Sequence, residues 1–429
     1  MKTRILQILG LMMVLGLVLA ACQPQVKEDE PATIDFWFAT GRGRDAGVAA
    51  VAEAFQAIHP HITVNYTAYP FGEFHGAVAV ALASDEPPDL FFEGGAWTES
   101  YAYSGALLPL DDIYTEEDLG DFLPGYLDLL TYEGKLYGAP FQSSAGAMWY
   151  NVDQFEAAGV EAPSTLEEGW TWPEFVENVN KVREHQASLG NEVYGMVGFS
   201  NPLRQLFFAG QILRTFSAPG DPGWELIAED LSTVRGFVDS DEAMEAYEFF
   251  QSIYADGFSP MEDIPDAFET GKAVTDFTIP ASGGGFAKNW PDLNFDAMPL
   301  PYMKTPLTHL GGILPMVTAK TDNPDEAKLF AQYFTSKEGY TAYHNVSPTI
   351  PARLSLVAEL EGLQSGHLDL LFQQMVEWGH KQPGGPAKAI LIQVIGNNLL
   401  PNIGLGGDIE AEVEAAIQEV DAQLTQFQE

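Results

Sequence analysis

Aromatic, amide and carboxylate side chains suited to holding a hydroxylated solute fall near the ends of expected strands. Glu93 and Trp97 flank a Gly-Gly pair, and Gln142 and Ser144 lie in a short polar stretch. Carboxylate and amide groups bond hydroxyls, and flat aromatic faces stack on sugar rings. An ordinary strand connection also explains the polar stretch, and packing on its own lobe also explains Trp97. The candidate stacking platforms are Trp37, Trp97, Trp149 and Trp290.

Catalytic chemistry has weaker support than binding. The 61 acidic residues always supply a carboxylate pair for glycoside hydrolysis, but abundance is not geometry. No His-Glu-x-x-His or Gly-x-Ser-x-Gly motif occurs, and the eight histidines have no metal-ligand spacing. Cys22 is the single cysteine, which excludes thiolate sites and an internal disulfide. We therefore expect a binding protein that is not an enzyme, with no cofactor and no metal.

Two arginines bear on the class of ligand. Arg42 and Arg44 follow the first expected strand in a chain whose formal net charge is −41. A guanidinium pair could recognise the carboxylate or phosphate of an acidic sugar, or it could simply balance charge on an acidic lobe. The overall charge should repel nucleic acid and anionic lipid headgroups, so neither is an expected partner.

The N-terminal segment predicts secretion and anchoring. Lys2 and Arg4 precede an apolar run that ends at Ala21, which is typical of a signal peptide. Leu19-Ala20-Ala21-Cys22 resembles the bacterial lipobox, in which the cysteine is lipidated. Lipid on Cys22 would hold the protein at the outer face of the cell membrane. Residues 1–21 are then the signal peptide and residues 22–32 a tether.

Strands and helices alternate from residue 33 onward. Ile34 to Phe38 predicts a strand, a helix follows from Asp45, and two further strands are expected near Ile62 and at Leu90-Phe91-Phe92. This order is the βαβ rhythm of an open α/β sheet, where ligands bind beyond the carboxyl ends of the strands. A later strand, Tyr194 to Phe199, should deliver Asn201 to the same cleft. At 429 residues, two lobes are the default expectation.

The stretch from Tyr132 to Phe155 predicts the first crossing between lobes. Glu133-Gly134 is an expected hairpin turn, and Ala147 to Asn151 an expected strand. Gly134-Lys135-Leu136-Tyr137-Gly138-Ala139-Pro140, followed by Tyr150-Asn151-Val152-Asp153-Gln154-Phe155, resembles the sugar-binding proteins of ABC importers. Pro87-Pro88-Asp89, Phe268-Glu269-Thr270-Gly271-Lys272-Ala273-Val274 and Asn323-Pro324-Asp325-Glu326-Ala327 follow in the family's order.

The resemblance implies a two-lobed α/β fold of the type II periplasmic-binding-protein class, similar to maltose-binding protein, with two or three hinge crossovers. It implies crossings near Phe141 to Gly146, Ala273 to Asp276 and Pro315 to Thr321, and it places Gly311 and Gly312 at the cleft. Lobe 1 would comprise residues 33–142 and 275–318, and lobe 2 residues 143–274 and 319–429.

The function that the resemblance implies is capture of an extracellular carbohydrate by a monomer and its delivery to an ABC permease. A polyamine, a glycerol phosphodiester, and a surface-anchored glycoside hydrolase are the alternatives. The expected ligand-binding residues are Trp37, Arg42, Arg44, Glu93, Trp97, Gln142, Ser144, Asn201, Trp290, Gly311 and Gly312.

Overall fold

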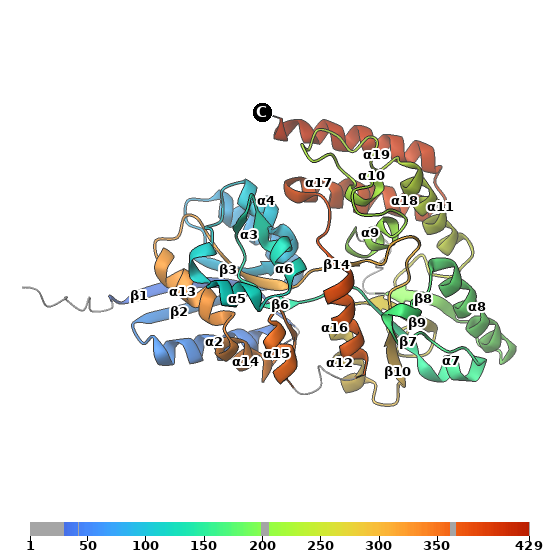
Figure 1. Ribbon diagram of the computed structural model, residues 1–429, viewed down its shortest axis with the longest axis horizontal. Helices are drawn as coiled ribbons and strands as arrows, with labels where there is room; N and C mark the ends of the chain where they lie inside the picture. Colours follow the sequence, from blue (N-terminus) through green and yellow to red (C-terminus); the bar gives the residue numbers. More distant parts are fainter. Residues whose placement is uncertain (1–29, 42, 199–205, 361–365, 429) are drawn as a thin grey trace, which may run out of the picture.

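Two α/β lobes lie side by side along the long axis of the molecule (Figure 1). The computed structural model describes residues 30–41, 43–198, 206–360 and 366–428. The predicted signal peptide, Cys22 and most of the tether therefore lie outside the described residues. Each lobe contains its own 4-stranded sheet and its own large apolar cluster, so the predicted two-lobed α/β fold is confirmed. No described helix is both long and apolar enough to cross a bilayer.

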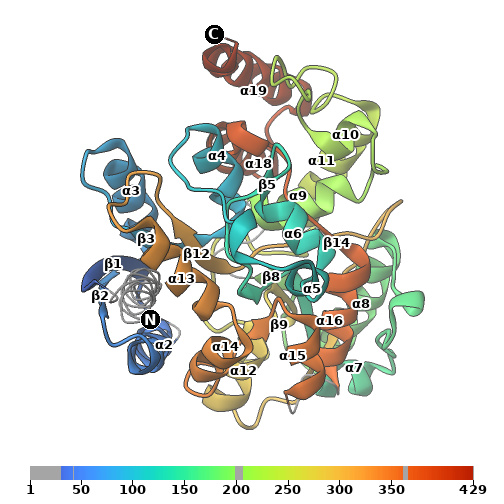
Figure 2. The same ribbon diagram turned by 60° about the vertical axis from the view of Figure 1, so that its left-hand side comes forward.

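The lobe 1 sheet has the order β12-β3-β1-β2, with β12 antiparallel and the other strands parallel. Alternation along β1 sends Phe36 and Phe38 into the core, while Trp37 points to the opposite face. Helices α2, α13 and α14 cover the Phe36 side and α3 lies on the other side (Figure 2). The strands are β1 Ala32–Ala39, β2 Ile62–Tyr69, β3 Leu90–Gly94 and β12 Ile313–Val317.

The lobe 2 sheet has the order β10-β7-β9-β8, in which only β8 and β9 are parallel. Its strands are β7 Ala147–Asn151, β8 Tyr194–Gly198, β9 Ala273–Thr278 and β10 Phe295–Met298. The short strands are β4 Thr131–Tyr132, β5 Lys135–Leu136, β6 Gln142–Ser143, β11 Thr308–His309, β13 Ile350–Pro351 and β14 Gly379–His380.

Helices begin where local sequence supplies caps. Thr171 and Glu174 form a reciprocal capping box at the start of α8. The predicted cap Asp45 is wrong, because α2 begins one residue earlier, at Arg44. The helices of lobe 1 are α2 Arg44–Ile58, α3 Phe71–Ala83, α4 Thr98–Tyr103, α5 Glu116–Gly120, α6 Pro124–Leu130, α13 Pro324–Phe334, α14 Lys337–His344 and α15 Leu354–Glu359.

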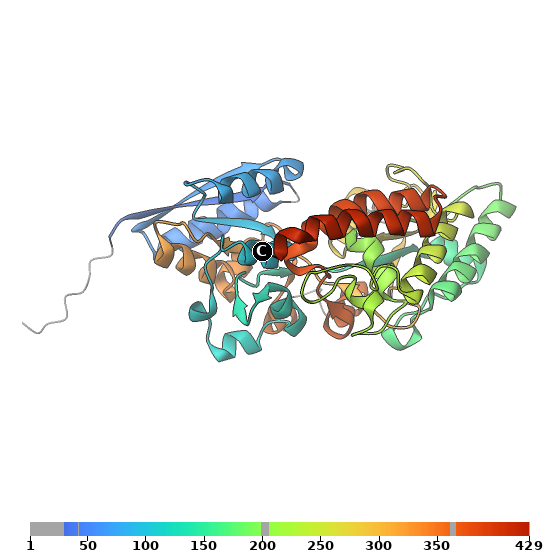
Figure 3. The same cartoon turned by 90° about the horizontal axis from the view of Figure 1, so that it is seen from above.

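Lobe 2 is completed by the C-terminal helices, and α19 runs along its upper surface (Figure 3). Its helices are α7 Val152–Ala158, α8 Trp172–Ser188, α9 Leu206–Arg214, α10 Pro222–Glu225, α11 Asp241–Ala255, α12 Ala281–Asn289, α16 His367–Trp378, α17 Lys388–Leu391, the π-helix η6 Ile392–Leu399, α18 Leu400–Gly404 and α19 Ile409–Leu424. Single 3₁₀ turns are η1 Gly95–Trp97, η2 Asp111–Ile113, η3 Leu166–Glu168, η5 Gly385–Ala387 and η7 Thr425–Phe427.

The structure divides the chain between lobes differently from the sequence prediction. The first crossing follows β6, within the predicted 141–146 stretch. However, β9 and β10 both belong to the lobe 2 sheet, and the chain returns to lobe 1 only between β11 and β12. Helices α13, α14 and α15 then pack in the lobe 1 core, and α17 to α19 in lobe 2. The predicted crossing at 273–276 instead lies inside the buried strand β9. The one predicted at 315–321 begins inside β12 and continues into an exposed turn at Ala319 and Lys320.

One further prediction fails for a packing reason. Trp149 is fully buried against Phe286 and Phe295, so it cannot be a stacking platform for a ligand. The Gly283-Gly284-Gly285 run lies close by, inside α12. Gly283 is required there because a Cβ would lie 2.4 Å from the Trp149 ring.

Candidate functional site

The two crossing strands lie side by side at the junction between the lobes. Ser144 N donates to Gly311 O at 3.0 Å, and Gly311 N donates to Ser144 O at 2.8 Å. Gly146 N also donates to Thr308 Oγ1 at 3.0 Å. Paired crossings of this kind can twist as a unit, which is the geometry of a hinge. The structure therefore brings Ser144 and Gly311 together.

Gly312 fastens this hinge to lobe 1. Its φ of 130° favours glycine, and a Cβ would lie 2.1 Å from Gln142 O. The same Gln142 oxygen accepts a hydrogen bond from Tyr126 OH at 2.5 Å. Gly312 O in turn accepts from Gly95 N at 2.9 Å, so the end of β3 is tied directly to the hinge. Gln142 and Gly312 were both predicted to bind the ligand. In the structure Gln142 contributes its carbonyl oxygen to the hinge, and Gly312 contributes its positive φ.

Glu93 presents an unused acceptor beside this junction. Its Oε1 accepts from Gly94 N at 3.1 Å. Its Oε2 is buried, lacks a hydrogen-bond partner among the described residues, and lies 3.5 Å from His75 Nδ1. Because an unpaired buried carboxylate oxygen is costly, a ligand that donates a hydroxyl hydrogen there would be stabilised.

Trp97 stacks on the imidazole of His75, with ring centroids 4.0 Å apart and an interplanar angle of 25°. Tyr101 OH lies 3.1 Å from His75 Nδ1. Burial and the charge of Glu93 raise the pKa of Tyr101, so its hydroxyl keeps its proton. His75 therefore covers one face of the Trp97 ring, which was predicted to stack on a ligand. Sequence reasoning assigned no role to His75, because the histidines have no metal-ligand spacing.

The lobe 2 side of the hinge is a buried polar network centred on Gln211 and His309. Gln211 Oε1 accepts from Thr308 Oγ1 at 3.1 Å and from His309 N at 3.0 Å. Burial and the Arg214 guanidinium hold the pKa of His309 well below its ordinary value. Neutral His309 donates from Nδ1 to Phe207 O at 2.8 Å and accepts at Nε2 from Arg214 Nη1 at 2.9 Å. This network holds the hinge strand β11 against helix α9 of lobe 2.

Arg44 is buried and engaged with its own lobe. Its Nε donates to Ala39 O at 2.6 Å and its Nη2 to Thr40 O at 2.8 Å, closing the carboxyl end of β1. Its guanidinium also lies 5.3 Å from the centroid of the Phe71 ring. These contacts favour a structural role for Arg44 over recognition of an acidic ligand. Arg42 and Asn201 lie outside the described residues.

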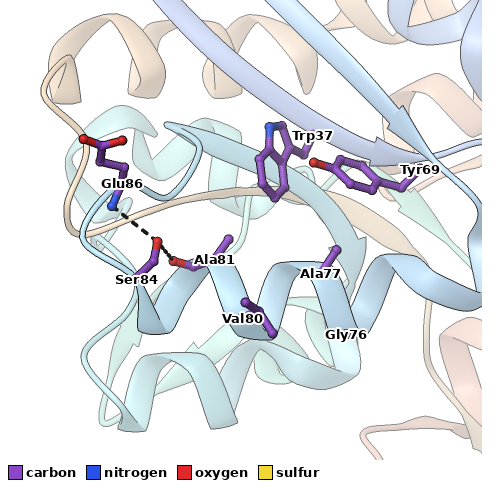
Figure 4. Close-up of a pocket in the computed structure, with 8 residues that line it drawn as sticks. All are labelled: Trp37, Tyr69, Gly76, Ala77, Val80, Ala81, Ser84 and Glu86. Carbon is purple, nitrogen blue, oxygen red and sulfur yellow. Dashed lines mark hydrogen bonds between the residues drawn. The ribbon is translucent and has the colours of Figure 1, made fainter.

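Two of the predicted aromatic platforms lie in separate pockets away from the hinge. Trp37 lies 4.8 Å from Tyr69, measured between ring centroids, over α3 (Figure 4). That pocket has a volume of about 450 Å³. Trp290 lines a second pocket of about 380 Å³ on lobe 2. The residues that line the Trp37 pocket are Trp37, Tyr69, Gly76, Ala77, Val80, Ala81, Ser84 and Glu86.

Comparison with known proteins decides the family. Residues 50–366 match the family described as bacterial extracellular solute-binding proteins. This chain belongs to that family. The solute-binding protein is 25% identical over 312 residues to a putative binding protein of Brucella abortus, covering 68% of this chain and 71% of the relative. It is 26% identical over 299 residues to the maltotriose-binding protein of Pyrococcus abyssi, covering 67% of this chain and 59% of the relative.

The solved structures agree on the fold. The sugar-binding protein MalE of Xanthomonas citri superimposes on the solute-binding protein with a TM-score of 0.76 at 20% identity, covering 92% of this chain and 98% of that one. The predicted family and two-lobed fold are therefore confirmed. Among the described residues, no group of three or more histidine, cysteine or acidic side chains could hold a metal ion.

Proposed function

We propose that this solute-binding protein captures a neutral carbohydrate at the junction of its lobes and presents it to the permease of an ABC importer. The observation that carries the proposal is Glu93 Oε2, next to the hinge strands, which has no hydrogen-bond partner among the described residues. It lies 3.5 Å from the imidazole of His75, and that imidazole stacks on Trp97. A carboxylate acceptor and an aromatic surface match the hydroxyls and the apolar face of a sugar ring. Family membership supports extracytoplasmic binding of a solute without chemical conversion.

The hinge supplies the mechanism. A ligand that contacts both lobes gains all its contacts only when the lobes are closed, so it favours the closed state by its differential affinity. The paired strands at Ser144 and Gly311 let the lobes turn while their mutual hydrogen bonds persist. The permease then recognises the closed shape. In the proposed arrangement, lipid on Cys22 holds the monomer at the outer face of the membrane.

The charge of Glu93 separates the ligand classes. It favours ligands that donate hydrogen bonds and disfavours anions such as a glycerol phosphodiester. A polyamine also satisfies the charge of Glu93 but uses no stacking face. The relatives named for binding maltotriose and for binding sugars make a carbohydrate the better-supported class.

A thermal-shift screen followed by titration tests the proposal. Neutral mono- and oligosaccharides, glucuronate and spermidine are added separately, since a ligand that binds only the folded chain raises its melting temperature. The binding saccharide is then titrated into Glu93→Gln and Trp97→Ala. Loss of a hydrogen bond to a charged group should weaken binding about 10- to 100-fold in Glu93→Gln. Glu177→Gln, an exposed change on α8, is the matched control.

Two results would overturn the proposal. The first is a screen in which spermidine stabilises the chain and no saccharide does. The second is an unchanged saccharide affinity in Glu93→Gln. Release of reducing ends from a glycan by the pure protein would instead favour a glycoside hydrolase.

A further inference from the structure

Trp290 lines a polar pocket that contains none of the hinge residues. Its neighbours come from three chain segments: the end of β7 with the start of α7, the segment around Glu269, and the loop after α12. Asn151 ends β7, whereas the hinge crossing precedes the other end of that strand. The pocket is therefore at the end of lobe 2 remote from the hinge. Its lining residues are Asn151, Asp153, Glu269, Asn289, Trp290, Pro291, Asp292, Leu293 and Asn294.

The ring of Trp290 is not part of a core. Trp290 is partly buried, yet it belongs to none of the apolar clusters formed by the described residues. The backbone of Trp290 is held in place, because Trp290 N donates to Phe286 O at 2.8 Å and Leu293 N donates to Trp290 O at 3.0 Å. A large, half-buried ring that lines a polar pocket is an available stacking surface.

Asn151 supplies an unused donor to the same pocket. Asn151 is 8% exposed, and its Oδ1 caps α7 by accepting from Gln154 N at 3.0 Å. The Nδ2 of this amide donates to no residue that the structure describes, although it lines the pocket. An amide donor that is not bonded within the protein can donate to a ligand oxygen that reaches the pocket.

The pocket walls are pinned before any ligand arrives. Val152 N donates to Asn294 O at 2.9 Å, and Asn294 Nδ2 donates to Asp153 Oδ1 at 2.8 Å. These bonds fasten the loop after α12 to the start of α7. Walls ordered in this way reduce the entropy lost on binding.

Charge selects the ligand class. The lining contains three carboxylates, from Asp153, Glu269 and Asp292, and no lysine, arginine or histidine. Burial, together with the nearby Asp266 carboxylate, raises the pKa of Glu269. An anionic ligand would add further repulsion, whereas hydroxyl groups can donate to these oxygens and accept from Asn151.

From the half-buried ring, the unused amide donor and the acceptor-rich walls, we propose that this pocket is a second carbohydrate site, specific for a neutral sugar ring. Its volume of about 380 Å³ falls in the range of small-molecule sites. The site is separate from the hinge and does not depend on ligand binding there. It would hold one sugar residue while the lobes remain free to open and close.

The test follows the indole N–H resonance of Trp290 in the full-length ¹⁵N-labelled protein. Trp290→Ala assigns that resonance by its absence. D-glucose and D-glucuronate form a matched probe pair, because the two sugars differ only in the carboxylate at C6. We expect glucose to shift the Trp290 resonance and glucuronate to shift it at least tenfold less at equal concentration. The shift should persist in Trp97→Ala, whose substitution lies in lobe 1.

Glu269→Gln provides a second variant should Trp290→Ala fail to fold, and it should weaken the glucose response at least tenfold. No shift of the Trp290 resonance at saturating glucose would overturn the second site. If saccharides still raise the melting temperature in that case, the hinge proposal stands alone. Equal shifts by glucose and glucuronate would also overturn the assignment, because they would indicate an adventitious effect without charge selection. Glucose could shift the Trp290 resonance while saccharides stabilise Glu93→Gln as much as the wild type. That pair of results would contradict the hinge site only.

Discussion

Gly312 faces the carbonyl oxygen of Gln142 so closely that a Cβ on Gly312 would lie 2.1 Å from it. The Gln142 oxygen cannot retreat freely, because it also accepts the hydroxyl of Tyr126. The hinge thus depends on a residue that has no side chain. Sequence reasoning selected both residues as ligand contacts, whereas the structure shows each of them in a backbone role.

Gly312→Ala should therefore destabilise the protein by about 2–4 kcal/mol, combining strain at positive φ with overpacking. Urea unfolding measures the loss. Gly284→Ala is the matched control, because no atom lies within 4 Å of its expected Cβ in the helix α12. That control should gain about 0.5–1 kcal/mol from helix propensity. Equal effects of the two substitutions would contradict the packing argument.

Lys388 carries a buried amine without a hydrogen-bond partner among the described residues. Burial lowers its pKa to about 8, with Arg214 and Lys381 acting in the same direction and Glu99 opposing them. The unfolded chain therefore binds this proton more tightly, and stability should rise between about pH 8 and the ordinary lysine pKa of about 10.4.

Lys388→Met should raise the melting temperature at pH 7 and abolish that rise with pH. Lys381→Met is the control, since Lys381 is ion-paired with Glu99 at 3.0 Å and its pKa is raised. The measurement is the melting temperature from pH 6 to 10. A Lys388→Met profile parallel to that of the wild type would contradict the prediction.

Asp276 lies in β9 with its carboxyl buried. Burial raises its pKa to about 8, and the Glu269 and Asp263 charges add to the shift. The folded chain therefore holds this proton more tightly than the unfolded chain. Its contribution to stability is fully present below about pH 4 and is lost as the pH rises toward 8, at about 1.4 kcal/mol per pH unit.

Asp276→Asn should match the wild type near pH 4 and exceed it in unfolding free energy at pH 8. Denaturant titrations at both pH values check this, with Asp292→Asn as an exposed control. A stability difference that does not change with pH would show that Asp276 is ionised in the folded state.

Arg44→Met should cost stability and leave ligand charge preference unchanged. The guanidinium satisfies two carbonyl oxygens at the end of β1, and hydrogen bonds to charged groups contribute about 1.5–3 kcal/mol. Arg235→Met, which removes an exposed pair with Glu414, should change stability much less, because solvent screens an exposed ion pair. If Arg44→Met instead weakened binding of an acidic sugar while stability stayed constant, the carboxylate-recognition hypothesis would regain support.

Apolar periodicity and turn chemistry predicted much of the local structure. The strand around Phe36, the helix beginning after Thr171 and the hairpin turn at Glu133-Gly134 all form where short-range patterns placed them. These features depend on neighbours within a few residues, so the linear chain contains the information. The ordered succession of motifs added the family, which the comparison with known proteins confirmed.

The sequence by itself determined the two α/β lobes, the solute-binding family and most strand positions, because alternation and capping act locally. Only the tertiary structure decided which tryptophans remain available. Trp149 is sealed by Phe286, Trp97 is stacked on His75, and Trp290 stays outside every core cluster of the described residues. The strand β9 was likewise assigned to lobe 2 by pairing with β7. Both outcomes depend on contacts between residues far apart in the chain, which no local pattern records.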